Sequence, residues 1–278
     1  MTVGIVTGAG RGMGAACAER LAGMVDVLVL VDRDEVLLAT QADMLAAAGH
    51  RAQVEPFVLD VKDPGGITRL AARVAELGPL RAVAHAAGVS PTMADWREIL
   101  TINLIGTARL VEACRVLAVQ DTAVVCFASV AALLALDQGD LPPDAVLDDP
   151  LAVGFLDRIH EAVGPAIEDP GMAYTWSKRG VHRLVRREAV RFGQVGARIC
   201  SVTPGMIDTP MGRQEAEARD TSAMLVDMSP LHREGLADEV AAGAVFLLSD
   251  DASFISGIDL PVDGGLVAAI RGGTGTLS

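Results

Sequence analysis

The chain has 278 residues, of which 51% are hydrophobic, and carries a formal net charge of −13 with an isoelectric point near 4.7. This charge disfavours nucleic acid and anionic membrane surfaces as partners, because both are negatively charged. The longest apolar run, Ala123 to Leu136, has 14 residues, which is shorter than the roughly 20 that a membrane-spanning helix needs. We therefore expect no association with a membrane.

The cysteines lie far apart within apolar runs, at Cys17, Cys114, Cys126 and Cys200. Their spacing matches neither a metal site nor a disulfide framework, so we expect buried free thiols in a reducing compartment and no bound metal. The start of the chain does not resemble a secretion signal, because Val3 to Val6 already has the pattern of a strand. These features predict a cytoplasmic protein.

A short strand and a glycine-rich turn open the chain. Val3 to Val6 is apolar, and the glycines that follow it precede a helical pattern of alanine and leucine. Glycines let the backbone turn sharply and approach a pyrophosphate, which the N-terminus of the helix then stabilises. A tight turn without a ligand is the alternative. The candidate dinucleotide-binding residues of this loop are Gly8, Arg11, Gly12, Met13 and Gly14.

A second predicted strand, Val27 to Val31, ends in Asp32 and Arg33. Asp32 follows the last glycine by about the 20 residues expected of a carboxylate that binds an adenosine ribose. Such a carboxylate accepts from the 2′-hydroxyl and repels a 2′-phosphate, so it favours NAD over NADP. Arg33 is compatible with a phosphate partner or with exposure to solvent, and we give the charge of Asp32 more weight.

Two further strands are expected from Ala52 to Leu59 and from Leu80 to His85, with helices from Glu35 to Ala48 and from Ile67 to Leu77. Ligands of parallel sheets bind at the carboxyl ends of the strands. Asp60 at such an end is therefore either an acceptor for an adenine amino group or the N-cap of the helix that begins near Pro64. The cofactor contacts expected after these strands are Asp60, Val61, Ala86, Ala87 and Gly88.

A long amphipathic helix is predicted from Trp96 to Val119, with Asn103 in its apolar part. An amide in such surroundings must be hydrogen-bonded or its burial is costly. A helix-distorting role, a water-holding role and a satisfied core amide all remain open. A fifth strand from Ala123 to Ala128 ends in Ser129, which is either a hydrogen-bond donor at the edge of the sheet or an ordinary strand-end serine.

Residues 130–172 interrupt the alternation of strands and helices with nine carboxylates and one arginine. Asp149 and Pro150 have the pattern of an N-cap followed by proline at the first helical position. An apolar stripe from Leu151 to Val163 follows them. We interpret this segment as a solvated acidic insertion that is attached to the rest of the protein by a single helix. A cap over the substrate and an altered subunit interface are the alternatives.

The next helix, from Ala173 to Phe192, carries Tyr174, which is the only tyrosine of the chain, and Lys178. Residues four apart lie on the same face of a helix. The ammonium group therefore lies near the phenol and is expected to lower its pKa from about 10. A tyrosine with such a pKa can exchange a proton near neutral pH. Taken alone, the pair is also compatible with an ordinary helix surface.

The remaining chain contains a strand from Ala197 to Val202, a helix from Asp238 to Leu248 and a strand from Gly257 to Val262, followed by a glycine-rich tail. Residues 206–231 mix charges with methionines, which adapt to varied apolar shapes. This segment is either a mobile substrate lid or a pair of surface helices. The whole pattern predicts one α/β domain with a Rossmann fold, a doubly wound seven-stranded parallel sheet with helices on both faces.

In order and spacing, these motifs resemble the short-chain dehydrogenase/reductase family, in its non-extended branch, over nearly the whole chain. The matching residues are Thr7-Gly8-x-x-x-Gly12-x-Gly14, Asp60-Val61, Ala86-Ala87-Gly88, Asn103, Ser129, Tyr174-x-x-x-Lys178 and Pro204-Gly205 with Thr209.

The resemblance implies a role for each matching residue. Tyr174 would be the general acid/base, and Ser129 would hold the substrate oxygen. Lys178 would lower the pKa of the tyrosine and bind the nicotinamide ribose, and Asn103 would position a water of a proton relay. Further cofactor contacts would be made by Tyr174 itself and by Pro204, Gly205, Ile207 and Thr209.

The chain departs from the family pattern at two places. His85-Ala86 replaces the asparagines that often precede Ala-Gly, so the hydrogen bonds of those amides are in question. The interval from Ser129 to Tyr174 is also longer than usual. In this respect the chain is similar to bacterial 3α-hydroxysteroid dehydrogenase/carbonyl reductase. The insertion precedes a helix through which such enzymes often oligomerise, which favours a homodimer over a homotetramer.

The implied function is an NAD-dependent oxidoreductase for an apolar, steroid-like secondary alcohol or ketone. An NADP-dependent carbonyl reductase and a catalytically silent dinucleotide-binding regulator are the alternatives.

Overall fold

The computed structural model describes residues 1–134, 139, 141–218 and 221–272, so parts of the expected insertion, lid and glycine-rich tail lie outside the described residues. Seven parallel strands form one sheet in the order β3-β2-β1-β4-β5-β6-β9. This confirms the predicted fold class. The strands are β1 (Val3–Thr7), β2 (Val27–Asp32), β3 (Gln53–Val58), β4 (Leu80–His85), β5 (Ala118–Phe127), β6 (Arg198–Pro204) and β9 (Asp259–Val262).

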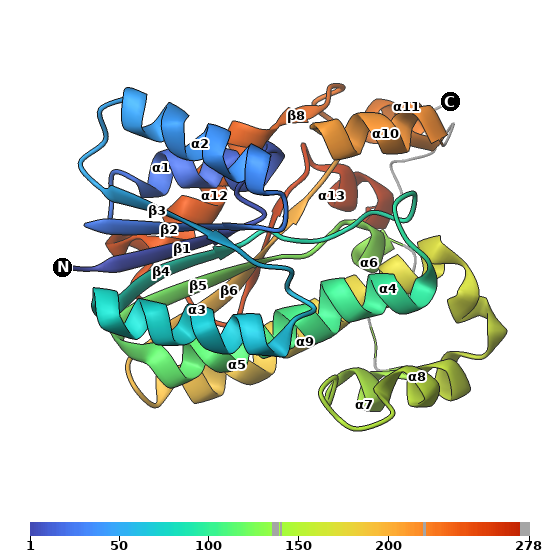
Figure 1. The fold of residues 1–278 in the computed structure, drawn as a ribbon. Helices are drawn as coiled ribbons and strands as arrows, with labels where there is room; N and C mark the ends of the chain where they lie inside the picture. Colours follow the sequence, from blue (N-terminus) through green and yellow to red (C-terminus); the bar gives the residue numbers. More distant parts are fainter. Residues whose placement is uncertain (135–138, 140, 219–220, 273–278) are drawn as a thin grey trace.

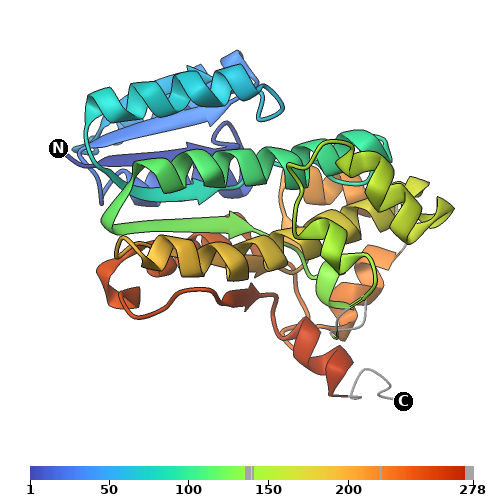
Figure 2. The ribbon, with the colours of Figure 1, turned by 90° about the horizontal axis from the view of Figure 1, so that it is seen from below.

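Helices cover both faces of the sheet (Figure 1). Above it in this view lie α1 (Gly12–Leu21), α2 (Glu35–Ala47) and α12 (Ala237–Leu248). Figure 2 shows the other layer from below, with its helices side by side. Each face of the sheet has its own apolar core, because the strands alternate their side chains between the two layers. The lower layer is formed by α3 (Pro64–Leu77), α4 (Trp96–Leu100), α5 (Thr107–Leu117) and α9 (Pro170–Gly193).

The strand order determines where a ligand can bind. β1 pairs with β2 on one side and with β4 on the other, so the chain leaves the centre of the sheet in opposite directions. A crevice forms outside the carboxyl ends of the strands at such a switch point. The register places Thr7 beside Val31 and His85, so the residues that follow these three strands meet at one edge.

The predicted helix from Trp96 to Val119 is not continuous. Between α4 and α5 lies a π-helical segment, η1 (Thr101–Gly106), which contains Asn103. The helix is therefore distorted at Asn103, which was one of the alternatives considered for this residue. The alternative role of Asp60 as an N-cap is wrong, because Asp63 caps α3 by accepting from the main-chain N–H of Gly65.

The insertion contains α6 (Ala131–Leu134), α7 (Asp144–Leu147), α8 (Phe155–Val163) and the 3₁₀ turn η2 (Pro165–Glu168). The predicted N-cap at Asp149 is wrong. α8 begins five residues beyond Pro150, after Gly154, whose φ of 73° is accessible to glycine. Leu147, Phe155 and Ile159 are buried, whereas Leu151 is 39% exposed and lies outside the apolar stripe. Burial of these three side chains, rather than the local capping signal, therefore decides where the helix begins.

Ion pairs attach this insertion to α9, so it does not dock through one helix alone. Arg179 Nε and Nη2 donate to the two carboxylate oxygens of Asp144, both at 2.6 Å. Arg183 donates to Asp148 at 2.8 and 2.6 Å and approaches Asp144 at 3.2 Å. Asp144 is 2% and Arg179 7% exposed. Both charges are thus removed from water and depend on each other.

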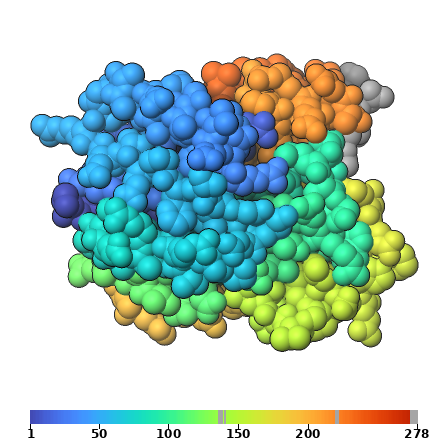
Figure 3. Space-filling model, in the orientation of Figure 1, coloured from blue at the N-terminus to red at the C-terminus, as the bar shows by residue number. Residues whose placement is uncertain are grey.

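The chain after β6 adds elements that the sequence did not predict. A two-stranded sheet joins β7 (Ile207–Asp208) to β8 (Gly235–Leu236), and α13 (Leu266–Arg271) forms where only a glycine-rich tail was expected. Between β7 and β8 lie α10 (Pro210–Ala218) and α11 (Thr221–Met228). In the space-filling view, this orange segment covers one corner of the molecule beside the blue N-terminal segment (Figure 3).

Throughout the described residues, each helix is too short or too polar to cross a membrane. The four cysteines are buried and unbridged, as predicted.

The buried ion pair gives a stability test. Asp144→Asn should lower the free energy of unfolding by about 3 kcal/mol, because it removes the charged partner of two short hydrogen bonds from the buried Arg179 guanidinium. Arg20→Met, which removes the exposed pair with Asp238, should cost less than about 1 kcal/mol. Urea unfolding measures both variants, and equal losses would contradict the distinction.

Candidate active site

The turn between β1 and α1 requires glycine for steric reasons. Gly8 has a φ of 66°, and a Cβ there would lie 2.9 Å from the main-chain nitrogen of Ala87. A Cβ on Gly14 would overlap the carbonyl oxygen of Gly8. Arg11, the N-cap of α1, makes no side-chain cap hydrogen bond. The main-chain N–H groups of the first turn of α1 therefore remain suited to an anion such as a pyrophosphate.

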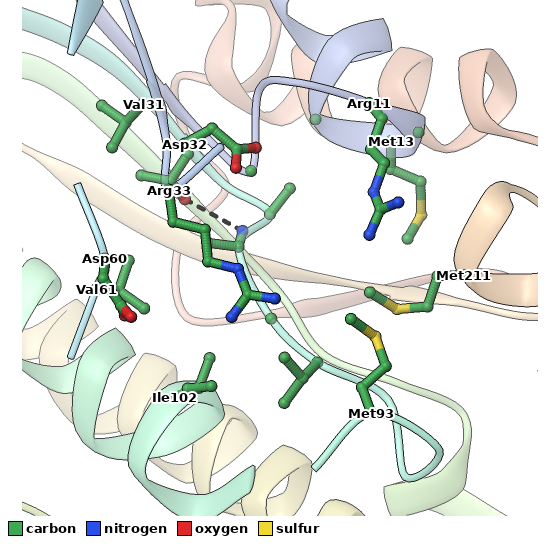
Figure 4. Close-up of a pocket in the computed structure, with 18 of the residues that line it drawn as sticks. Arg11, Met13, Val31, Asp32, Arg33, Asp60, Val61, Met93, Ile102 and Met211 are labelled. Carbon is green, nitrogen blue, oxygen red and sulfur yellow. Dashed lines mark hydrogen bonds between the residues drawn. The ribbon is translucent and has the colours of Figure 1, made fainter. Parts of the chain in front are cut away.

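A cleft of about 890 Å³, open to solvent, extends along the carboxyl ends of β1, β2, β3 and β4. Figure 4 shows side chains from several segments converging on it. Thirteen of the predicted cofactor residues line this cleft: Gly8, Arg11, Gly12, Met13, Gly14, Asp32, Arg33, Asp60, Val61, Ala86, Ala87, Gly88 and Thr209. Pro204, Gly205, Ile207, Tyr174 and Lys178 are outside its lining.

The carboxylate of Asp32 is held by two main-chain donors. Its Oδ2 accepts from Gly10 N–H at 3.0 Å and its Oδ1 from Asp34 N–H at 3.1 Å. These contacts hold a negative charge at the end of β2, beside the cleft. Arg33 is exposed and also lines the cleft, where its side chain extends between Asp32 and Asp60 (Figure 4). Arg33 therefore does not simply point away into solvent.

His85 connects the glycine loop to the π-helical segment. Its Nδ1 lies 2.7 Å from Thr7 Oγ1 and its Nε2 lies 2.8 Å from Thr107 Oγ1. The Thr107 hydroxyl donates to the main-chain oxygen of Asn103, and Thr7 Oγ1 accepts from Ala87 N–H. His85 must then donate from Nε2 and accept at Nδ1. Burial, followed by the charge of Lys178, lowers the pKa of His85 to about 3, so the ring is neutral.

Asn103 is fixed by the backbone of Val89. Its Oδ1 accepts from Val89 N–H and its Nδ2 donates to Val89 O, both at 2.9 Å. A Cβ on Gly88 would lie 3.1 Å from Asn103 Oδ1 and 3.7 Å from Lys178 Nζ. Glycine at this position thus lets the wall of the cleft approach both side chains directly.

Tyr174, Ser129 and Lys178 form a cluster behind this wall. The Ser129 hydroxyl lies close enough to the Tyr174 phenol to lower its pKa. Lys178 Nζ lies 5.7 Å from the centre of the Tyr174 ring and donates to the main-chain oxygen of Phe127, at the end of β5, at 2.8 Å. The structure therefore brings together the four residues that the sequence proposed as catalytic, since Asn103 Oδ1 and Lys178 Nζ both lie next to Gly88.

The expected lowering of the Tyr174 pKa is wrong for the protein without a ligand. Burial raises the pKa to about 12, the negative charge of Glu215 adds to this rise, and the hydrogen bond with Ser129 opposes it. Burial also lowers the pKa of Lys178 to about 8, against the opposing effects of Cys126 and Glu215. The sequence revealed the neighbouring cation but not the burial of Lys178 or the charge of Glu215.

Comparisons with known proteins agree with this geometry. Residues 8–141 and 161–267 match the family profile described as enoyl-(acyl carrier protein) reductase. D-Threitol dehydrogenase of Mycolicibacterium smegmatis is 32% identical over 275 residues, covering 95% of this chain and 92% of its own. Levodione reductase of Leifsonia aquatica is 31% identical over 281 residues, covering 95% and 94%.

A solved structure shares the whole fold. The 3α-hydroxysteroid dehydrogenase of Pseudomonas sp. B-0831, crystallised with NADH, superimposes with a TM-score of 0.76 at 28% identity, covering 98% of this chain and 99% of its own. The chain belongs to the short-chain dehydrogenase/reductase family. It is accordingly an oxidoreductase of a family that binds a nicotinamide dinucleotide.

Sequence reasoning missed several residues of the cleft. Met93, Ile102 and Met211 add an apolar wall to it, and Figure 4 shows Met93 and Met211 on the same side. The methionine content of residues 206–231 signalled the last of these, but no local pattern marked Met93. Glu215 was also missed, because nothing in the sequence indicates which face of α10 turns inward.

The burial of Lys178 predicts an unusual stability profile. The depressed pKa means that the ammonium group destabilises the folded, ligand-free protein below pH 8, by about 3 kcal/mol at neutral pH. Lys178→Met should therefore be more stable than the natural protein at pH 7.

This advantage should shrink as the pH rises from 8 to 10.5, because only the unfolded natural chain binds the proton in that window. Urea unfolding of both proteins across this range measures the difference. A Lys178→Met protein that is less stable at pH 7 would contradict the expected sign.

Proposed function

We propose that this protein is an NAD-dependent dehydrogenase/reductase that interconverts a secondary alcohol and a ketone. The observation that carries the proposal is the cluster behind Gly88, in which the Tyr174 phenol lies near the Ser129 hydroxyl and its ring centre is 5.7 Å from Lys178 Nζ. All the groups needed for proton transfer to a carbonyl oxygen lie next to a dinucleotide-sized cleft. This complete set does not favour a catalytically silent regulator.

The residues of the cleft fit a nicotinamide dinucleotide. The glycine turn would hold the pyrophosphate against the N-terminus of α1, and Asp32 would accept from the adenosine ribose. Asp60 lies at the end of β3, where an adenine would be placed. Thr209 and, from the family pattern, Pro204, Gly205 and Ile207 would lie towards the nicotinamide. When bound, the dinucleotide supplies or accepts the hydride.

Tyr174 would transfer the proton. Its raised pKa keeps the phenol protonated at neutral pH, which is the form that donates to a carbonyl oxygen during reduction. Ser129 would hold the same oxygen, and Lys178 would favour the phenolate as the proton leaves. Asn103 positions the backbone at Val89 and, through its main-chain oxygen, contacts Thr107. In the proposed relay, this segment would hold a water.

The substrate would be an apolar secondary alcohol or ketone. Met93, Ile102 and Met211 supply an apolar wall, and α10 and α11 would serve as the lid. The names of the relatives include a dehydrogenase of D-threitol, a reductase of levodione and a 3α-hydroxysteroid dehydrogenase, which supports a carbinol or ketone as the reacting group.

The proposal also includes a cytoplasmic location and assembly into a homodimer or homotetramer. The location is supported by the four buried thiols, which suit a reducing compartment. The insertion packed against α9 supports the dimer, because it occupies part of that helix.

Tyr174→Phe tests the chemistry. It should lower kcat at least 1,000-fold while NADH affinity changes by less than about threefold, because the ring remains and only the proton donor is lost. Oxidation and reduction of a panel of secondary alcohols and ketones, followed by nicotinamide absorbance, measures kcat, and fluorescence titration measures NADH binding. Unchanged turnover, or NADH binding by the natural protein without turnover of any substrate, would contradict the proposal.

Asp32→Ala tests the cofactor preference. Removing the fixed negative charge should raise the ratio of kcat/KM for NADP over NAD roughly tenfold or more. Asp43→Ala removes an exposed carboxylate from α2 and is the matched control. A natural protein that prefers NADP, or an unchanged ratio in Asp32→Ala, would show that Asp32 does not select NAD.

A further inference from the structure

A series of buried hydrogen bonds links the wall of the cleft to the π-helical segment. Ala87 N–H donates to Thr7 Oγ1 at 3.2 Å, and that hydroxyl lies 2.7 Å from His85 Nδ1. On the other side of the ring, Nε2 lies 2.8 Å from Thr107 Oγ1, and the Thr107 hydroxyl donates to the main-chain oxygen of Asn103 at 2.8 Å. Apart from Ala87, each residue of the series is at most 3% exposed.

The hydrogen bonds of this series all point in the same direction. Thr7 Oγ1 accepts from Ala87 N–H, so its own hydrogen is available to His85 Nδ1. His85 Nε2 then donates to Thr107, whose hydroxyl hydrogen lies on Asn103. Hydrogen bonds aligned in this way polarise and strengthen one another. Loss of the imidazole ring would therefore weaken the contacts at both of its ends.

The series closes on itself through the cleft wall, which is formed by residues 86–89. Asn103 Oδ1 accepts from Val89 N–H and its Nδ2 donates to Val89 O, both at 2.9 Å. Val89 lies two residues beyond Ala87, where the series begins. Both ends of this wall are thus held by groups that His85 connects.

The two ends of the wall serve different parts of the proposed function. At one end, a Cβ on Gly8 would lie 2.9 Å from Ala87 N, so the glycine-rich turn packs directly on the wall. At the other end, a Cβ on Gly88 would lie 3.1 Å from Asn103 Oδ1 and 3.7 Å from Lys178 Nζ. A shift of the first end would change how the dinucleotide is held, and a shift of the second would displace the catalytic cluster.

Resting on the proposed function, we propose that His85 is a positioning residue that aligns the dinucleotide-binding wall with the segment that carries Asn103. Through Thr7, His85 Nδ1 holds the wall against the glycine-rich turn. Through Thr107, His85 Nε2 holds Asn103 beside the catalytic cluster. A residue that served only the cohesion of the core would change stability, but neither the cofactor affinity nor the turnover of the folded protein.

Two amide substitutions separate the two ring nitrogens. Burial lowers the pKa of His85 to about 3, so a neutral amide replaces the ring near pH 7 without a change of charge. The amide of His85→Asn reaches the position of Nδ1 but not that of Nε2, because asparagine branches at Cγ. Glutamine branches at Cδ, so the amide of His85→Gln reaches the position of Nε2 instead.

The two variants should therefore fail in different ways. His85→Asn loses the contact with Thr107, so kcat should fall about tenfold or more while the Kd for NADH stays within about threefold. His85→Gln loses the contact with Thr7, so the Kd for NADH should rise about fivefold or more while kcat at saturation stays within about threefold. Fluorescence titration measures NADH binding. NADH oxidation with the best ketone of the panel measures kcat.

Substitutions at the neighbouring threonine test the same series independently. Thr107→Val should lower kcat as His85→Asn does, and Thr107→Ser, which keeps the hydroxyl, should restore it. The double variant His85→Asn/Thr107→Val should be within about twofold of the more impaired single variant, because both changes break one series. Thr122→Val is the matched control. It removes a buried hydroxyl that donates to Leu80 O at 2.6 Å, at the end of β4 away from the cleft, and should lower stability alone.

The outcomes are distinguishable. Folded His85 variants that lose stability as Thr122→Val does, with kcat and NADH affinity unchanged, overturn the positioning role and leave the proposed function intact. Equal losses of kcat and affinity in both amide variants also overturn it. Urea unfolding shows which variants are folded. If neither His85 variant folds, unchanged kcat in Thr107→Val overturns the inference. NADH binding by the natural protein without turnover of any panel substrate overturns the proposed function and this inference with it.

Discussion

The site depends on a single ammonium group held almost without water. Lys178 is 7% exposed, and its Nζ donates to the carbonyl oxygen that ends β5. That contact joins the catalytic helix α9 to the sheet at the level where the cleft begins. The same group lies 3.7 Å from the position that a Cβ on Gly88 would take. The cleft wall, helix α9 and strand β5 therefore all lie next to this one ammonium group. Burial of this charge destabilises the protein, and in the proposed function the same charge acts on the Tyr174 phenol.

His85, at a position where the family often has asparagine, connects the glycine-rich turn to the π-helical segment. His85 bridges two threonine hydroxyls whose other partners are Ala87 N–H and the Asn103 carbonyl. Every donor in this series of hydrogen bonds has an acceptor, which fixes the tautomer of the His85 ring. Where the chain departs from the family pattern, it therefore has a fully hydrogen-bonded side chain.

Sequence reasoning succeeded where a residue's role follows from local geometry. Gly14 is required by a steric contact with Gly8 in the same turn, and Asp32 is the last residue of a strand that the sequence pattern predicted. Sequence reasoning failed where contacts between residues far apart in the sequence determine the local structure. Asp149 and Pro150 have a strong capping pattern, yet the helix begins after Gly154 because Phe155 and Ile159 fill a core.

The same limit applies to the site. That Tyr174 and Lys178 are neighbours could be predicted from their spacing, but the direction of the tyrosine pKa depends on burial by segments far away in the sequence. The effect of Glu215 on the pKa of Tyr174 could not be predicted either, because it depends on where the chain after β6 lies relative to α9.

The insertion has a mechanical consequence for the catalytic helix. Arg179 directly follows Lys178, and Arg183 lies one further turn along α9, so the attachment points of the insertion are on the helix that carries the phenol. Rigid rotation of α9 about its axis would have to break a bidentate ion pair on one side and the Lys178 contact on the other. The ion pairs at Asp144 and Asp148 therefore restrain the rotation of the helix that carries Tyr174 from outside the cleft.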